Sequence, residues 1–166
     1  MRALTVRQPY TDAIAHGAKP VENRTKPLSP KFVGVPVLLH AAKEPHATGI
    51  TAAGLAQFTG AQITNWSDTR SAALAVIRFR GSHKAFDGDW CCRPWGQVTT
   101  RTQPEVWHWE IDQVIRLAEP VPATGALGFW NVPADVLDQI EQDCHQLAYD
   151  DAKRILSALE NLEPTP

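Results

Sequence analysis

The chain has 166 residues and a mass of 18.3 kDa, which leaves room for one domain of ordinary size. Its composition, 43% apolar, 8% aromatic and 20% charged, excludes a disordered chain, a collagen-like repeat and a coiled coil. No stretch approaches the roughly 18 to 20 consecutive apolar residues of a membrane-spanning helix, and the N-terminal sequence lacks the apolar block of a signal peptide. We therefore expect a cytoplasmic protein that makes no contact with a membrane.

Charge is distributed unevenly along the chain, although the net charge is only −2. Residues 1–43 hold seven basic and two acidic residues, a net charge of +5, whereas residues 131–166 carry −6. A basic front part favours a partner that is locally anionic, such as nucleic acid or a nucleotide, because the local field steers association. A set of solvated surface cations accounts for the same charge equally well.

The first half of the chain alternates short strands and helices. Residues 3–6 predict a strand, and a helix follows whose first turn contains Pro9 and whose end is Gly17, a left-handed cap. Residues 18–24 predict an extended loop or edge strand, because Pro20 prevents a long helix. Further along, the pattern indicates a buried strand over 35–42, a short helix over 51–58, and a strand over 73–80 with Arg78 and Arg80 facing outward.

The second half predicts a long loop, two strands and two helices. Glycine, proline and threonine clusters indicate a loop over 81–104, and clean alternation indicates a strand over 106–112. Pro120 and Pro122 bound a predicted turn, and a last strand follows over 126–132. Acidic amphipathic helices are predicted over 134–147 and 151–162.

These elements predict an α+β fold, a small β-barrel with helices at its periphery and a C-terminal helical extension. Residues 1–133 form the barrel domain in this interpretation, the helices of residues 134–162 pack on that same domain, and residues 163–166 are a frayed tail. The sequence does not fix the oligomeric state.

Three charged residues near the N-terminus form the main candidate site. Glu22 and Arg24 are two residues apart in an extended segment and therefore point to one side, and Lys19 joins them if the turn at Pro20 brings it round. The cations could bind a phosphate or a base edge, while Glu22 accepts from an exocyclic amine or orients Arg24. A salt-bridged surface turn is the alternative reading.

Other candidate binding residues surround these three in the predicted fold. Tyr10 is either a base-stacking platform or a core aromatic, and His40, at the end of a buried strand, is either a satisfied core histidine or a site residue. Gln8 stands where the first strand opens into the helix, a common place for ligand contacts. Lys43 follows the strand that ends with His40, and Trp95 lies on a predicted loop, where it could offer a stacking surface.

The sequence predicts neither a metal site nor a cofactor. His83, Cys91, Cys92 and His108 carry the side chains that zinc prefers, but no C-x-x-C or H-x-x-x-H spacing is present. The adjacent cysteines suit neither a normal disulfide nor a four-ligand zinc site, and three cysteines are too few for a disulfide framework.

Several motifs occur in order along the first 133 residues: ALTVRQPY from Ala3, GAKPVENR from Gly17, LLHAAK from Leu38, CRPWG from Cys92 and GALGFW from Gly125. Together they resemble the ASCH domain family, whose signature is G-x-K-x-x-E-x-R. The resemblance implies a PUA-like β-barrel with a cleft beside the first helix, which related domains use for RNA or modified nucleobases. It implies RNA, possible single-stranded nucleic acid or a modified nucleoside as the partner.

The resemblance also leaves an enzyme open. Some family members are amidohydrolases that remove an acyl group from acetylcytidine with a Lys-Thr-Glu trio. Lys19 matches the lysine, but Glu22 stands where the threonine belongs, and the trio's glutamate has no clear counterpart. If this chain is an enzyme, Lys19 and Glu22 are its candidate catalytic residues. Ribonuclease activity, with His40 moving protons, is a further alternative, and binding is preferred over both.

Overall fold

The computed structural model describes residues 1–85, 91–143 and 149–160. These residues form an α+β fold, as the sequence predicted, and their six strands make one mixed sheet. The strands are β1 (Arg2–Val6), β2 (Val21–Arg24), β3 (Pro36–Ala41), β4 (Ala72–Lys84), β5 (Trp107–Pro122) and β6 (Phe129–Asn131). The helices are α1 (Tyr10–Ala15), α2 (Ala52–Thr59), α3 (Ala134–Asp143) and α4 (Tyr149–Glu160), with a short 3₁₀ turn, η1 (Pro30–Phe32).

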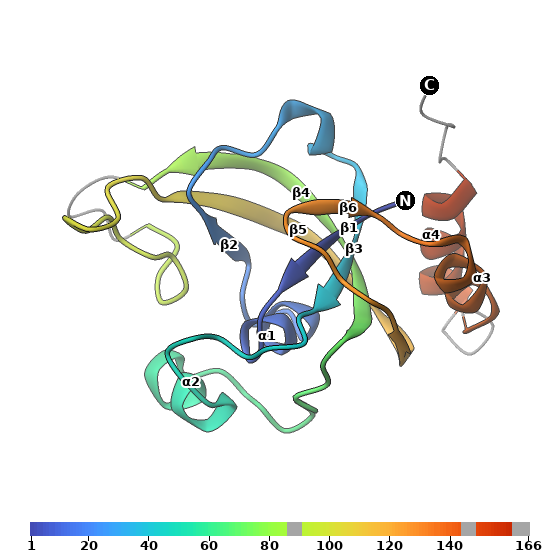
Figure 1. The fold of residues 1–166 in the computed structure, drawn as a ribbon, viewed down its shortest axis with the longest axis horizontal. Coiled ribbons are helices and arrows are strands. Elements are labelled where there is room, and N and C mark those ends of the chain that lie inside the picture. The colour runs from blue at the N-terminus through green and yellow to red at the C-terminus, as the bar shows by residue number, and fades with distance from the viewer. Residues whose placement is uncertain (86–90, 144–148, 161–166) are drawn as a thin grey trace.

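The sheet has the order β2-β5-β4-β3-β1-β6 and bends into a half-barrel. Only β1 and β3 pair in parallel among the described strands; the remaining neighbours are antiparallel. The long ribbon of β4 and β5 has three register shifts, and such irregularities let a strand pair twist and curve. Figure 1 shows this ribbon arching over α1, with α3 and α4 at the opposite end of the molecule from the 91–104 loop.

Both faces of the half-barrel are apolar. Successive side chains of a strand point to opposite faces, and in the central strands both sets of side chains are apolar. Leu4, Leu39 and Ile77 belong to the interior cluster, together with Ile14 of α1. Their chain neighbours Ala3, Leu38 and Val76 belong to a second cluster, which includes Val136 and Ile140 of α3 and Ile155 of α4. The C-terminal helices therefore cover the outer face of the sheet.

Helix α1 begins and ends as the sequence predicted. The side chain of Thr11 donates to the carbonyl of Val6 at 2.7 Å, and this bond ties the first turn of α1 to the end of β1. After the helix, Gly17 has a φ of +73°, the left-handed conformation in which the absence of a Cβ avoids strain. The local sequence therefore predicted the first strand, the helix that follows it and the glycine after the end of that helix.

Two expectations about the long hairpin were wrong. The predicted loop begins too early, because β4 continues through residues 81–84, and the predicted turn between Pro120 and Pro122 lies inside β5. The reason is pairing between the two strands: His83 faces His108 at one end, and Ala72 faces Pro122 at the other. This long-range ladder overrides the local turn signals of glycine and proline.

Remaining elements differ from expectation mainly at their ends. The strand expected over 126–132 is confined to β6, residues 129–131. Helices α3 and α4 confirm the two acidic helices over their described parts, whereas residues 144–148 and 161–166, including the predicted tail, lie outside the described residues. Among the described helices, none combines the length and apolar character that crossing a bilayer requires.

Candidate functional site

An open cavity of about 1600 Å³ lies beside α1. Its walls come from the ends of β1 and β3, from β2, from α2 and from the loops around residues 93–98 and 124–128. Seven of the predicted binding residues line it: Tyr10, Lys19, Glu22, Arg24, His40, Lys43 and Trp95. Segments far apart in the chain thus contribute to one hollow.

Lys19, Glu22 and Arg24 meet in this cavity and form what we call the ion triad. The ammonium of Lys19 lies 3.0 Å from one carboxylate oxygen of Glu22, and Nε of Arg24 lies 3.2 Å from the other oxygen. Lys19 is only 2% exposed and donates a further hydrogen bond to the carbonyl of Val21. One carboxylate therefore holds two cations, and the triad has a net charge of +1.

Edge strand β2 explains why these three side chains meet. Its extended backbone puts Glu22 and Arg24 on one side, opposite Trp109 and Trp107 of β5 in the pairing register. The amide of Lys19 donates to the carbonyl of Ala13 at 2.9 Å, and this bond folds the turn after α1 back toward the helix. The sequence spacing and the observed geometry agree here.

Arg24 is held by two elements besides the triad. Its terminal nitrogen donates to the carbonyl of Thr5 at 3.1 Å, and its guanidinium carbon lies 5.5 Å from the ring centre of Trp109. Stacking on an aromatic face suits the planar guanidinium and fixes its orientation. The Arg24 side chain keeps 27% exposure, so it is the most accessible charge of the triad.

Tyr10 and Trp95 flank the triad in different ways. Tyr10 is half-buried, and the Lys19 ammonium lies 5.9 Å from its ring centre. Burial, and secondarily the negative charge of Glu22, raises the pKa of the Tyr10 phenol, so the group stays neutral at physiological pH. Trp95 is 9% exposed and packs among Ala13 and other apolar side chains, so most of its ring belongs to the core.

His40 sits under a loop at the inner end of the cavity and is 1% exposed. Its Nε2 donates to the carbonyl of Ala123 at 3.0 Å, which leaves Nδ1 to accept from the hydroxyl of Thr5 at 3.3 Å. Burial lowers the pKa of His40, although the bond to Ala123 opposes this shift. A Cβ on Gly125 would lie 2.4 Å from the imidazole, so only glycine lets the loop pass so closely. The structure thus satisfies His40 fully within the fold.

Gln8 does not line the cavity. It is completely buried, donates to the carbonyl of Thr69 at 2.8 Å and accepts from the amide of Asp12 at 3.1 Å. Asp12 in turn accepts from the amide of Asp68. Gln8 therefore ties α1 to the 67–70 loop, a structural role that its position before Pro9 did not reveal.

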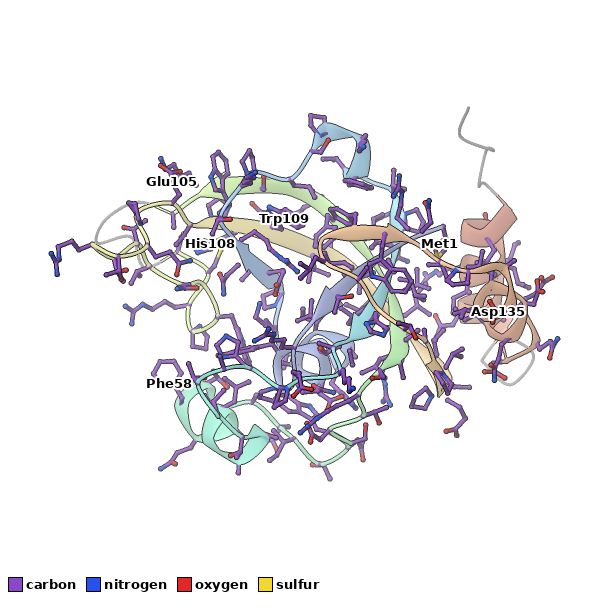
Figure 2. All side chains as sticks on the ribbon, in the orientation of Figure 1. Met1, Phe58, Glu105, His108, Trp109 and Asp135 are labelled. Carbon is purple, nitrogen blue, oxygen red and sulfur yellow. The ribbon has the colours of Figure 1, made fainter. Side chains whose placement is uncertain are left out.

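Sequence reasoning missed several residues at the cavity. Leu127 is 98% exposed, Phe58 on α2 is 74% exposed (Figure 2), and both line the cavity. Arg7 and Arg93 add cations to its wall beside Lys43. Apolar side chains at loop and helix positions look like core residues in a sequence, so their exposure was readable only in the fold.

Comparison of the sequence with known protein families and curated proteins finds no match. Among solved structures, the chain is similar to one titled "Crystal structure of ASCH from Zymomonas mobilis". The two share 8% identity and a TM-score of 0.48, over 94% of this chain and 93% of that one. The ASCH resemblance of the motifs and the cytoplasmic location stay predictions.

Proposed function

We propose that the cavity beside α1 binds RNA or a modified nucleoside, and that the protein is a binding module. One observation carries this proposal. Lys19, which is only 2% exposed, forms an ion pair with Glu22 and holds this carboxylate at the wall of a large open cavity. Removing two charged groups from water costs several kcal/mol, so a buried ion pair adds little net stability to the fold. A preorganised carboxylate flanked by a guanidinium is, in contrast, useful for recognising a polar ligand.

The chemistry of the triad fits the edge of a nucleobase. Glu22 can accept from an exocyclic amine, while Arg24 donates to a carbonyl or phosphate oxygen of the same ligand. The cations of Arg7, Lys43 and Arg93 at the cavity wall add attraction for a phosphate backbone. A volume of about 1600 Å³ exceeds the roughly 300–1,000 Å³ of an ordinary small-molecule pocket, which favours a short single strand over a free nucleoside.

The positions of Lys19 and His40 favour binding over catalysis. Lys19 donates to both a carbonyl and a carboxylate, so its nitrogen serves as a charged donor and is poorly placed to take a proton. His40 has both ring nitrogens engaged beneath Gly125, which argues against a ribonuclease that uses it as a proton shuttle. Acyl hydrolysis and RNA cleavage are therefore the alternatives that an activity assay must address.

Glu22→Gln tests the proposal because it removes the charge and keeps the shape. We expect affinity for a short single-stranded RNA, or for acetylcytidine, to fall roughly 5- to 150-fold, since hydrogen bonds to charged groups contribute about 1–3 kcal/mol. Glu105→Gln is the matched control, because Glu105 is an exposed partner of Lys84 away from the cavity. Titration calorimetry measures both variants, and melting temperatures check that each is folded.

The outcomes separate the alternatives. Unchanged affinity in folded Glu22→Gln, or no measurable affinity of the wild type for either probe, would overturn the binding site. Release of acetate from acetylcytidine that disappears in Lys19→Ala, with the variant still folded at the assay temperature, would establish the hydrolase instead. Cleavage of the RNA probe that disappears in His40→Gln would establish the ribonuclease.

A further inference from the structure

We propose that His83, Cys91, Cys92 and His108 form a structural zinc site, which we call the Cys–His cluster. Each residue presents one nitrogen or sulfur atom, and the four atoms all lie within 4.8 Å of one another. The spacing of these residues in the sequence argued against such a site. The fold removes that objection, because the ligands come from two paired strands and the loop between them.

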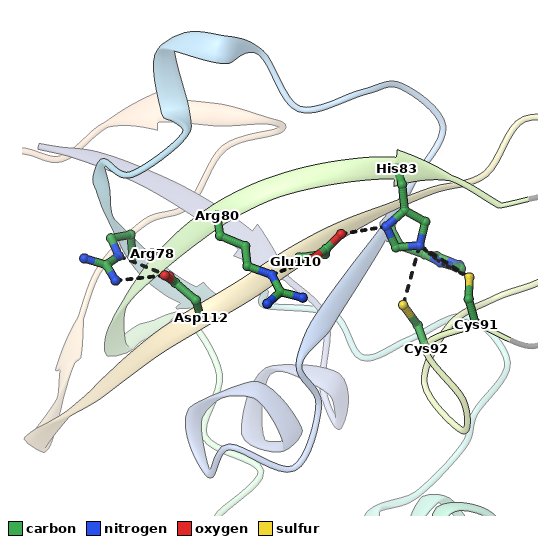
Figure 3. A network of polar contacts seen from close by, with 8 residues as sticks. Arg78, Arg80, His83, Cys91, Cys92, Glu110 and Asp112 are labelled. Atoms are coloured by element: carbon green, nitrogen blue, oxygen red, sulfur yellow. Dashed lines mark hydrogen bonds and ion pairs between the residues drawn. The ribbon is translucent and has the colours of Figure 1, made fainter.

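Strand register brings the two histidines together. His83 of β4 and His108 of β5 are direct partners in the antiparallel ladder, so both rings stand on the same face of the hairpin. Residues 91–95 then turn back over this face and place Cys91 and Cys92 beside the imidazoles. Figure 3 shows the thiols of Cys91 and Cys92 converging on the ring of His83.

Four of the distances between the donor atoms are close to those in a tetrahedral zinc site, and all four atoms lie within 4.8 Å of one another. Nδ1 of His108 lies 3.2 Å from Nε2 of His83. Sγ of Cys91 lies 3.3 Å from Nε2 of His83 and 3.5 Å from Nδ1 of His108. Sγ of Cys92 lies 3.6 Å from Nε2 of His83. Zinc bonds of about 2.0–2.1 Å to nitrogen and about 2.3 Å to sulfur, arranged tetrahedrally, separate two nitrogens by roughly 3.4 Å and nitrogen from sulfur by roughly 3.6 Å.

Hydrogen bonds to Glu110 and to the backbone of Gln97 hold both imidazoles in place. Nδ1 of His83 lies 2.7 Å from a carboxylate oxygen of Glu110, and Nε2 of His108 lies 2.9 Å from the carbonyl of Gln97. Each acceptor receives a hydrogen bond from one ring N–H, and this fixes the orientation in which the other ring nitrogen faces the cluster. Histidines that bind metals are held in this way by carboxylates and carbonyls. Glu110 is itself fixed by the guanidinium of Arg80 (Figure 3).

The turn that carries the cysteines is closely fitted. The amides of Trp95 and Gly96 both donate to the carbonyl of Cys92, at 2.9 Å and 2.6 Å. A Cβ on Gly96 would lie 2.7 Å from the carbonyl of Cys91 and 2.9 Å from the ring of His108. Cys92 itself has a φ of +61°, an uncommon conformation for a residue with a side chain. The left-handed backbone at Cys92 thus places two adjacent thiols on the same side of the turn, at a cost in local strain.

Ligand types identify the metal and its role. Two thiolates and two imidazoles in a tetrahedron are the ligand set of structural zinc, and binding Zn²⁺ releases the two thiol protons to give a neutral site. Four protein ligands leave no position for a substrate, so the ion stabilises the turn. That turn carries Trp95, whose carbonyl accepts from the side chain of Asn23 in β2. The metal therefore connects the β4–β5 hairpin to the wall of the cavity.

The test begins with zinc itself and the full-length, reduced protein. After removal of metal with a chelator, we expect one Zn²⁺ per chain to bind in competition with a chromogenic chelator, and the melting temperature to rise. Co²⁺ in its place should give the visible and thiolate charge-transfer bands of a tetrahedral site. Wild-type protein that takes up no zinc, or whose Co²⁺ spectrum lacks thiolate bands, would overturn the proposal.

Variants then locate the site. Cys92→Ser should abolish the thiolate bands or weaken them, while Cys144→Ser, which removes the third cysteine of the chain, leaves zinc affinity unchanged. Glu110→Gln should weaken the affinity for zinc roughly 10- to 100-fold, because the carboxylate of Glu110 orients the imidazole of His83. Asp112→Asn is its control, because Asp112 lies on the same strand as Glu110 but pairs with Arg78 of β4 rather than with a residue of the cluster (Figure 3). Unchanged affinity in Cys92→Ser and Glu110→Gln would place the metal elsewhere.

Discussion

The ion triad and the Cys–His cluster are assembled differently, although Glu22 and His108 lie on paired strands, β2 and β5. The triad is contained in residues 19–24, so an extended backbone and one turn suffice to build it. The cluster draws on His83, Cys91, Cys92 and His108, and it depends on the register of two long strands and on the turn at residues 91–95. The comparison shows that a site confined to one segment is readable as a motif, whereas a cross-strand site is not.

Lys19→Ala tests whether the triad is an integrated part of the fold. Its loss leaves the carbonyl of Val21 and one oxygen of Glu22 without their donor, both in a buried setting. We expect the free energy of unfolding to fall by about 3–5 kcal/mol, the usual cost of breaking a buried ion pair. Urea denaturation measures this loss.

Lys84→Ala is the matched control for that prediction. Lys84 is 39% exposed and pairs with Glu105 at the surface, so its loss should cost about 0–1 kcal/mol. Equal effects of the two substitutions would mean that the triad is only a surface ion pair.

Gly96→Ala tests the close fit of the Cys–His cluster. The new methyl group would collide with the backbone of Cys91 and with the ring of His108, neither of which is the flexible end of a side chain. We expect a loss of about 1–3 kcal/mol in stability and a weaker affinity for zinc. Gly81→Ala, in the same hairpin, is the control, because its methyl group meets nothing within 4 Å. Equal stability and equal zinc affinity of the two variants would contradict the close packing around Gly96.

His40 gives the smallest expected effect, a pH dependence of stability. Burial lowers its pKa in the folded state, so below the ordinary value of about 6.5 the unfolded chain binds a proton that the folded chain resists. Its stabilising contribution is complete above that pH and declines as the pH falls toward the lowered folded pKa. Protonation at Nδ1 also removes the bond from Thr5.

Denaturation at several pH values between 7.5 and 5 measures this effect in wild type and in His40→Gln. We expect the loss of stability toward acid to be smaller in the variant, because glutamine does not titrate. The difference between the two curves isolates His40 from other groups, including His16, whose pKa burial also lowers. Parallel curves would contradict the assignment.

Much of the architecture was readable from local patterns. Alternation and helical spacing predicted the strands and helices of the half-barrel, and Gly17 marked the end of α1 as expected. Strand lengths were misjudged where pairing decided the outcome: Pro120 and Gly81 signal a break locally, yet both lie inside strands that support one another. Local sequence did not reveal the setting of Gln8, because its side chain donates through Nε2 to the carbonyl of Thr69 in a loop about 60 residues away.

By itself, the sequence determined the α+β class, the order of the elements and the ion triad, because each depends on contacts between residues close in the chain. Tertiary structure alone decided the cavity, the burial of His40 beneath Gly125 and the convergence of His83, Cys91, Cys92 and His108. The physical reason is register: shifting a strand by one residue moves every side chain to the other face. Local propensity does not encode which residue of β4 faces His108, and the packed sheet fixes that choice.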